Sequence, residues 1–308
     1  MPSKRPRTTL PEPQPGSDLR RKFALTESSA RRQPASAPPA LPPMIHGELR
    51  LTSKLGGGAV TEVWHAVTPA GSGVAVKLPL PEWAGHPGAA KLVEREWRHL
   101  LVAAHPGVVR PLHLVATARG PGLVAELLDG GDLVSLCGSH PRHWARACRQ
   151  IAAALNHLHE RGIVHRDVKP GNVLFDCRGD AKLIDLALAQ RSGSVASAGG
   201  GTPAYQSPSQ RSGAAARDAD DTHAFAVLLY ELLTGRLPFG RQPTLADLER
   251  RPPSPMKLTP RHAADAMLAE LTKRVVDLLT AAGHLAADAM PAIERSLDAI
   301  IAAHGQEA

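Results

Sequence analysis

Aromatic residues are scarce in this chain of 308 residues, at 3% of the sequence. A core must therefore be built mainly from leucine, valine, isoleucine and alanine, and 43% of hydrophobic residues is enough to fill one. Long apolar runs are missing as well. The longest, Ala224 to Leu233, is interrupted by Tyr230 and Glu231 and falls short of the roughly 20 residues that cross a bilayer. We therefore expect no membrane span.

Cysteine is also rare. Cys137, Cys148 and Cys177 are the three in the chain, and none belongs to a CxxC pair. Their odd number and their spacing fit neither a disulfide framework nor a zinc site, so we interpret them as thiols in a reducing compartment. The basic residues at the amino terminus are not followed by an apolar run, so we expect no secretory signal. These features predict a cytoplasmic protein.

Proline, serine and arginine dominate the amino-terminal segment, where large apolar residues are few. Eight basic and three acidic residues precede His46, a net +5 of the chain's +7. Such a composition cannot offset the entropy of ordering, so residues 1–46 are predicted to be a disordered tail. A basic arm can contact nucleic acid or acidic lipid. Because no aromatic or helical pattern accompanies the charge, we favour a solvated tail or tether and expect no nucleic-acid contact.

Short apolar runs separated by turn residues begin at Glu48. The runs ELRLTSKL, EVWHAV and GVAVKL predict an antiparallel meander, and two more strands are predicted in VVRPLHLVATA and GLVAELL. A helical period interrupts the strands in residues 89–104 and ends at the sequence HPG.

After Gly130 the pattern becomes mostly helical. A long amphipathic helix is predicted in residues 143–162, closed by Gly162, and an apolar helix in residues 220–235, closed by Gly235. Between them lies a hairpin-like region that holds the densest polar cluster of the chain, IVHRDVKPGNVLF. A β-rich first part, a mostly helical second part and polar groups where the two meet predict an α+β protein.

The order of LGGGAVTEVW, VAVK, a helical glutamate, HRDVKPGN, IDLA and GTPAYQSP resembles the signature set of protein kinases. One such motif alone is weak evidence, but six in order with ordinary spacing are specific. The resemblance covers nearly everything after the tail and is greatest to the eukaryotic-like (Hanks-type) serine/threonine kinases of bacteria.

This resemblance implies a bilobal α+β fold. The N-lobe, a small antiparallel sheet with one key helix, is expected in residues 47–128. The larger, mainly helical C-lobe is expected in residues 129–303, with a short tail in residues 304–308. Two weakly patterned helices, in residues 263–279 and 286–303, are expected to complete the C-lobe, and a separate partner-binding module is the alternative.

The resemblance implies a separate role for each group of the polar cluster. Asp167 is the expected catalytic base and Lys169 the cation that neutralises the transferred phosphoryl group. Asn172 and Asp185 are the expected ligands of the Mg²⁺ or Mn²⁺ that bridges the phosphates of ATP. Thr202, in GTPAY, is expected to bridge the catalytic loop and the substrate strand.

The N-lobe motifs imply ATP binding. Gly56 and Gly58 lie between two predicted strands, where the missing side chains let backbone amides approach phosphate oxygens. Lys77 is expected to contact the α and β phosphates and to be held by Glu96, nine residues before HPG. The expected adenine contacts are the apolar residues Leu55, Val63, Ala75 and Leu174 and the backbone of Glu126 and Leu127.

Three further residues lie in or near the motifs that imply ATP binding. Glu94 points about 200° away from Glu96 on a helix, so we interpret it as a surface charge. Thr61 stands at the position of the third glycine of the family pattern. Ala125 would stand at the back wall of the nucleotide pocket and leave it open.

The catalytic loop also raises the question of regulation. We interpret His165 as a packed structural histidine. Arg166, beside the catalytic aspartate, resembles the arginine of kinases whose activation segment is ordered by a phosphate. Ser194 or Ser197 would be the phosphorylated residue, and a serine-rich loop without a switch is equally open.

Lys169 and Thr202 resemble serine/threonine kinases rather than tyrosine kinases. Small-molecule phosphotransferases share the fold, but their catalytic loop typically reads HGD and lacks this lysine and the GTPAY segment. Protein serine and threonine hydroxyls are therefore the expected substrates, with self-association for autophosphorylation.

Several positions depart from the family pattern. Ala187 replaces the glycine of DFG, Ser209 replaces the glutamate of APE, and Ala226 replaces a frequent glycine in the helix that begins near Asp221. Asp221 is expected to brace the catalytic loop through backbone amides. None of these departures removes a group that contacts ATP or metal. We therefore favour an active enzyme, and a nucleotide-binding pseudokinase scaffold is the alternative.

Overall fold

The computed structural model describes residues 49–195, 200–250, 253, 266–280 and 289–304. All of them belong to one unit, Ala40–Ala308. The predicted tail, Ser197 and the first residues of both predicted C-terminal helices lie outside the described residues.

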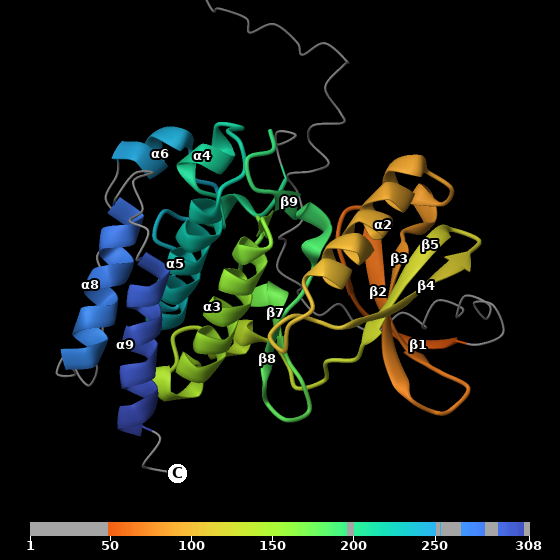
Figure 1. The fold of residues 1–308 in the computed structure, drawn as a ribbon, viewed down its shortest axis with the longest axis horizontal. Helices are drawn as coiled ribbons and strands as arrows, with labels where there is room; N and C mark the ends of the chain where they lie inside the picture. Colours follow the sequence, from red (N-terminus) through yellow and green to blue (C-terminus); the bar gives the residue numbers. More distant parts are fainter. Residues whose placement is uncertain (1–48, 196–199, 251–252, 254–265, 281–288, 305–308) are drawn as a thin grey trace, which may run out of the picture. The chain divides into compact units, whose positions relative to one another are not determined.

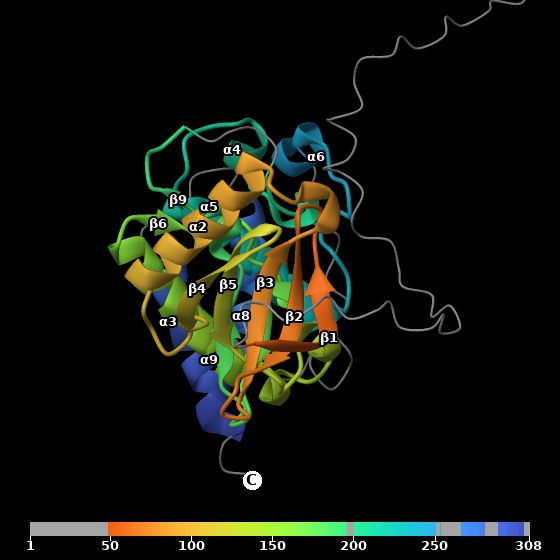
Figure 2. The same ribbon diagram turned by 90° about the vertical axis from the view of Figure 1, so that its right-hand side faces the viewer.

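An antiparallel five-stranded sheet forms the first part of the unit, with the strand order β1-β2-β3-β5-β4 (Figures 1 and 2). Its strands are β1 (Arg50–Gly57), β2 (Thr61–Val67), β3 (Gly73–Pro79), β4 (Pro111–Thr117) and β5 (Gly120–Glu126). Every second residue of β2 is buried, which is the period expected of a strand with one covered face. The predicted meander and the two further strands are confirmed.

Helix α2 (Pro87–Val102) packs against β3, β4 and β5. It begins after His86, whose ring accepts a hydrogen bond from the amide of Gly88, and Pro87 occupies the first turn. Ala89, Val93, Glu96 and Leu100 form its buried stripe. An acidic side chain within an apolar stripe needs a buried partner, so Glu96 points to a functional site.

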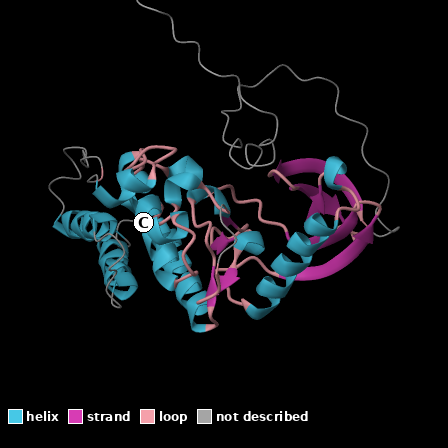
Figure 3. Ribbon diagram, turned by 90° about the horizontal axis from the view of Figure 1, so that it is seen from above, coloured by secondary structure: helices cyan, strands magenta, loops and turns pink. Residues whose placement is uncertain are grey.

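The second part consists mainly of helices (Figure 3). They are α3 (Ala145–Glu160), α4 (Pro208–Arg211), α5 (Asp218–Thr234), α6 (Leu245–Arg250), α8 (Ala266–Thr280) and α9 (Ala289–His304). α5 is buried along almost its whole length, as expected of a helix at the centre of a core. α8 packs against α5, and α9 packs against α3 and α8. Gly235, at a φ of 67°, ends α5 as predicted.

Two short strand pairs connect these helices and hold the polar loop. β6 (Ile163–Val164) pairs with β9 (Gln190–Arg191), and β7 (Val173–Phe175) pairs with β8 (Ala181–Leu183). The loop 165–172 runs between β6 and β7. Within the described part of the chain, no helix combines the length and the apolar character that a membrane crossing requires.

Candidate active site

A buried aspartate of α5 fixes the start of the loop 165–172 through hydrogen bonds. Asp221 accepts hydrogen bonds from the amides of His165 and Arg166, at 2.8 Å each, and lies 2.8 Å from Nε2 of His159. Burial alone would raise the pKa of Asp221, but the hydrogen bond and charge of His159 lower it below its usual range. The predicted brace is confirmed, and His159 is a partner for which the sequence had no signal.

Two residues near this loop have an unusual backbone conformation. Arg166 and Asp185 are the non-glycine residues with positive φ in the described ranges, at 69° and 63°. Such a conformation costs on the order of 1–3 kcal/mol and persists only where the surroundings enforce it. Arg166 adjoins Asp167, the predicted base, and Asp185 is itself a predicted metal ligand.

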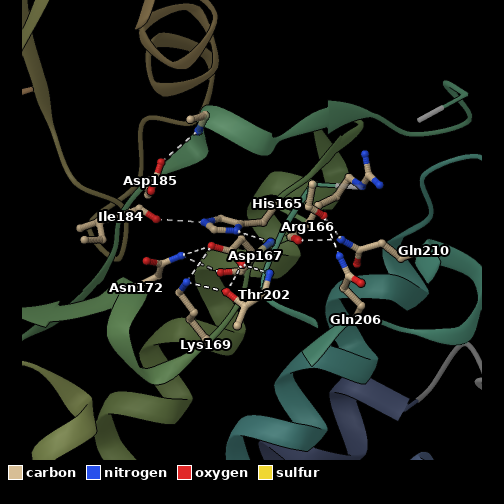
Figure 4. A network of polar contacts seen from close by, with 12 residues as sticks. His165, Arg166, Asp167, Lys169, Asn172, Ile184, Asp185, Thr202, Gln206 and Gln210 are labelled. Atoms are coloured by element: carbon tan, nitrogen blue, oxygen red, sulfur yellow. Dashed lines mark hydrogen bonds and ion pairs between the residues drawn. The ribbon is translucent and has the colours of Figure 1, made fainter. Parts of the chain in front are cut away.

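The carboxylate of Asp167 is the centre of a polar network (Figure 4). Its Oδ1 accepts hydrogen bonds from the amide and from the hydroxyl of Thr202, both at 2.8 Å. Its Oδ2 accepts one from Asn172 Nδ2 at 2.9 Å and lies 3.2 Å from the Lys169 ammonium. Lys169 also donates to the Thr202 hydroxyl at 2.6 Å. The structure thus brings four of the predicted residues together.

A second cluster joins the two parts of the unit. Lys77 Nζ lies 2.7 Å from Glu96 Oε2 and 2.7 Å from Asp185 Oδ1. The predicted partner Glu96 is confirmed, whereas Glu94 pairs with the exposed Arg98 at 3.1 Å. Lys77 comes from β3, Glu96 from α2 and Asp185 from the segment after β8.

The charges of this cluster oppose its burial. Burial would lower the pKa of Lys77, but Asp185 and Glu96 raise it above the ordinary lysine value. Burial raises the pKa of Glu96 to about 7, against the effect of Lys77. For Asp185, burial acts upward and the charge of Lys77 lowers the pKa below its usual range. Lys77, whose side chain is 13% exposed, is therefore a cation held between one buried and one part-exposed acid.

The glycine-rich turn connects β1 and β2. The amide of Gly58 donates to the carbonyl of Thr61 at 2.8 Å, which closes the turn where the family pattern has its third glycine. A Cβ added at Gly56 or Gly58 would meet nothing within 4 Å. The turn therefore has free room around it, as a phosphate cradle requires.

The expected adenine contacts come from five strands or their ends. Val63 pairs with Lys77 across β2 and β3, and Ala75 lies opposite Ala125 across β3 and β5. Leu174 belongs to β7, Leu127 follows β5, and Leu55 is 52% exposed.

The structure limits which backbone group of Glu126 is open to a nucleotide base. Its amide donates to the carbonyl of Arg110 at 3.0 Å, so a nucleotide base would have to use its carbonyl oxygen. Its carboxylate accepts from Lys182 at 2.9 Å.

Two glutamines join this site without any signal in the sequence. Gln210 Nε2 donates to the carbonyls of Arg166 at 2.8 Å and Gly200 at 3.2 Å, and Gln206 Nε2 donates to Gly200 at 2.9 Å (Figure 4). They tie the segment before α4 to the catalytic loop. Only the tertiary structure reveals them, because their partners are backbone carbonyls that any sequence has.

No group of three or more histidine, cysteine, aspartate or glutamate side chains forms a metal site among the described residues. A magnesium ion is commonly held by one or two carboxylates together with substrate phosphates and water. Asp185 and Asn172 match that pattern, because both offer hard oxygen ligands. The two hydrogen bonds of Asn172 Nδ2 to Asp167 orient its amide, which leaves Oδ1 as the atom for a cation.

The comparisons with known proteins agree with this geometry. A family model described as "Protein kinase domain" matches residues 49–286. The chain is 34% identical over 210 residues to "Serine/threonine-protein kinase pkn2" of Myxococcus xanthus, which covers 64% of this chain and 25% of that protein. It is 36% identical over 219 residues to "CBL-interacting protein kinase 4" of Oryza sativa subsp. japonica, and this match covers 67% of this chain and 48% of that protein. "Serine/threonine-protein kinase PkaA" of Streptomyces coelicolor is 35% identical over 213 residues, and this match covers 62% of this chain and 39% of that protein.

The chain therefore belongs to the protein kinase family. The predicted bilobal α+β fold is confirmed, with the sheet and α2 as N-lobe and the helical part as C-lobe. The chain spans a quarter to about half of the length of these relatives.

Proposed function

We propose that this protein is an ATP-dependent serine/threonine protein kinase, which transfers the γ-phosphate of ATP to protein hydroxyls. The observation that carries the proposal is the Asp167 carboxylate, buried and fixed by Thr202, Lys169 and Asn172. Three relatives from different organisms bear the words "protein kinase" in their names.

In this mechanism, Asp167 orients the substrate hydroxyl and accepts its proton. The bond from the hydroxyl oxygen to the γ-phosphorus forms while the bond from that phosphorus to the β–γ bridging oxygen breaks, and ADP leaves. Thr202 holds the carboxylate through two hydrogen bonds, so the base is oriented before the substrate arrives. Lys169 places a cation beside the transferred group and stabilises its charge.

The nucleotide would be held by residues of both lobes. Lys77, kept charged by Glu96 and Asp185, would contact its phosphates. Gly56 and Gly58 leave room for backbone amides to approach them. Asn172 and Asp185 would hold Mg²⁺ or Mn²⁺, which when bound neutralises charge on the phosphate oxygens. The adenine contacts stay a prediction.

The geometry also supports regulation through the activation segment. The Nε–H groups of Arg95 and Arg166 are buried and have no hydrogen-bond partner in the described part of the chain. Burial lowers the pKa of Arg166, and the positive charge of Arg95 adds to that shift. Such donors suit a phosphate on Ser194 or Ser197.

Other predictions remain open to test. The cytoplasmic location, the solvated tail and the self-association stay predictions, as do the domain limits.

The proposal is tested by incubating the purified chain with Mg²⁺, labelled ATP and a generic basic protein, followed by mass-spectrometric mapping of phosphosites. We expect phosphoserine or phosphothreonine with the wild type. Asp167→Asn should lower kcat at least about 100-fold, because it removes the base, and Asp185→Asn should abolish the metal dependence together with activity. Asp277→Asn, an exposed aspartate of α8, is the matched control and should behave as wild type.

Two outcomes would overturn the proposal. If the wild type transferred no phosphate while ATP raised its melting temperature, the protein would be a nucleotide-binding scaffold. If Asp167→Asn retained wild-type kcat, Asp167 would not be the base.

A further inference from the structure

The segment 200–210 carries Thr202 to the catalytic aspartate and then enters α4. At Gly201 this segment lies directly against the catalytic loop. The φ of Gly201 is 105°, and a Cβ there would meet the carbonyl oxygen of Arg166 at 2.8 Å and Nε2 of Gln210 at 3.1 Å. The segment therefore needs a firm anchor at its far end, because a small displacement would move Thr202 away from Asp167.

The far end of the segment is anchored on a buried acid. Asp220, in the first turn of α5, is 1% exposed. One of its carboxylate oxygens, Oδ1, accepts hydrogen bonds from the hydroxyls of both Ser207 and Ser209. The other oxygen, Oδ2, accepts from the amide of Arg217 at 3.0 Å.

Ser207 passes this anchor on to the catalytic loop. Its hydroxyl oxygen also accepts from the amide of Gln210 at 3.0 Å and so caps α4. The side chain of Gln210 in turn donates to the carbonyl of Arg166, next to Asp167. A continuous chain of hydrogen bonds thus connects Asp220 with the catalytic loop.

Charge complementarity accompanies these hydrogen bonds. Burial lowers the pKa of Arg166, and Asp220 and Asp221 are the carboxylates whose charges oppose that shift. The negative charge of Asp220 therefore acts on the guanidinium of Arg166 as well as on the serine hydroxyls.

We infer that Asp220 is a positioning residue for the substrate hydroxyl, because it anchors segment 200–210 through Ser207 and Ser209. In the family pattern an acid stands at the position of Ser209, within the segment itself. In this chain the segment has no acid at that position, and its hydroxyls donate to an acid of α5 instead. The inference rests on the proposed kinase function of the same site.

The competing explanation is that Asp220 only caps α5 through Arg217. Ser209→Ala separates the two roles, since it removes one anchor bond and leaves the bond from Oδ2 to Arg217 intact. Ser212→Ala is the matched control, because the exposed Ser212 hydroxyl donates to the carbonyl of Ser209 and does not contact Asp220. Steady-state kinetics with a peptide substrate give separate KM values for peptide and ATP.

We expect Ser209→Ala to lower kcat/KM for the peptide about 10-fold, which is the effect of losing a hydrogen bond to a charged group. The KM for ATP should stay within about twofold of the wild-type value. Ser209→Glu should be worse than Ser209→Ala, because it places a second carboxylate against Asp220. Exchanging the groups, in the double variant Ser209→Glu with Asp220→Ser, should recover part of that loss.

Three kinetic results would overturn the inference: equal kinetics for Ser209→Ala and Ser212→Ala, wild-type kinetics for Ser209→Glu, or no recovery in the double variant. Amide hydrogen exchange tests the anchor apart from catalysis. Amides of residues 200–206 should exchange faster in Ser209→Ala than in Ser212→Ala, while those of β3 and α2 stay unchanged. If the wild type had no kinase activity but exchange rose in this way, the proposed function would fail and the anchor would stand. Unchanged exchange would refute the anchor.

Discussion

At the scale of a single residue, the core keeps His223 neutral. It lies within α5 at 6% exposure, and its Nε2 has no hydrogen-bond partner among the described residues. Burial lowers its pKa to about 4. An unfolded histidine titrates near 6.5, so between these values the unfolded chain binds a proton that the folded chain does not. The free energy of unfolding therefore falls as pH drops through this window.

We expect His223→Phe to remove this acid sensitivity. Between pH 6.5 and about 4, the wild type should lose up to about 1.4 kcal/mol per pH unit relative to the variant. Above pH 7 their difference should be constant. Urea unfolding at pH 7.5, 6 and 5 measures it, with the exposed His143→Phe as control. Parallel pH dependence of His223→Phe and wild type would contradict the assignment of a neutral buried histidine.

At the scale of the secondary-structure elements, a buried acid connects the two strands that carry the glycine-rich turn. Glu62, on β2, accepts from Arg119 at 2.6 Å and pairs with Lys54 of β1 at 2.8 Å. Arg119 also donates to the carbonyl of Pro79, at the end of β3. Burial would raise the pKa of Glu62, but its hydrogen bonds with Lys54 and Arg119 lower it to about 2. These contacts hold the edge of the sheet beside the glycine-rich turn.

Glu62→Gln should loosen this edge. Loss of its charge is expected to cost about 1–3 kcal/mol of stability at pH 7 and to raise the KM for ATP. Because the folded pKa is depressed, the stabilisation is complete above about pH 4.5 and is lost as pH falls towards 2. The stability difference from wild type, measured by urea unfolding, should shrink below pH 4.5. Glu82→Gln, at an exposed residue, should show neither effect, and a constant difference at all pH values would count against the ion pairs.

At the scale of the whole described unit, contacts between the lobes bring the groups of the lysine–acid cluster together. Lys77 and Glu96 belong to the N-lobe, and Asp185 belongs to the C-lobe. Arg95 of α2 also donates to the carbonyl of Ala187. A shift of α2 would therefore separate Glu96 from Lys77 and at the same time disturb the segment that follows Asp185.

α9 follows the region that the kinase family model matches, residues 49–286. Ile293, Leu297 and Ile300 of α9 are at most 1% exposed and belong to the main core. Arg149 of α3 adds ion pairs to two acids of α9, Glu294 at 3.3 Å and Asp298 at 3.0 Å.

Truncation after residue 288 should therefore destabilise the C-lobe. Each of the three large aliphatic side chains contributes about 1.5–3 kcal/mol when buried, so we expect a loss comparable to the whole stability of a typical domain. Thermal unfolding of the truncated chain measures this, beside a chain that ends after residue 304. A melting temperature equal to that of the longer chain would show that α9 is dispensable.

The sequence alone indicated most of the fold and the chemistry of the site. Strand and helix periods predicted the sheet, α2, α3 and α5, since these patterns follow from local geometry. The predicted pair of Lys77 with Glu96 and the predicted brace by Asp221 are both present. The assigned roles in catalysis, in nucleotide binding and in metal binding stay predictions.

What the sequence determined by itself was the set of chemical groups and their order, because phosphoryl transfer needs particular side chains at short, readable spacings. Only the tertiary structure decided how groups distant in sequence meet. Asp185 reaches Lys77, 108 residues earlier in the chain, and Asp220 receives the hydroxyls of Ser207 and Ser209. These contacts depend on how α5, the catalytic loop and the sheet pack against one another. Packing of that kind leaves no periodic trace in the sequence.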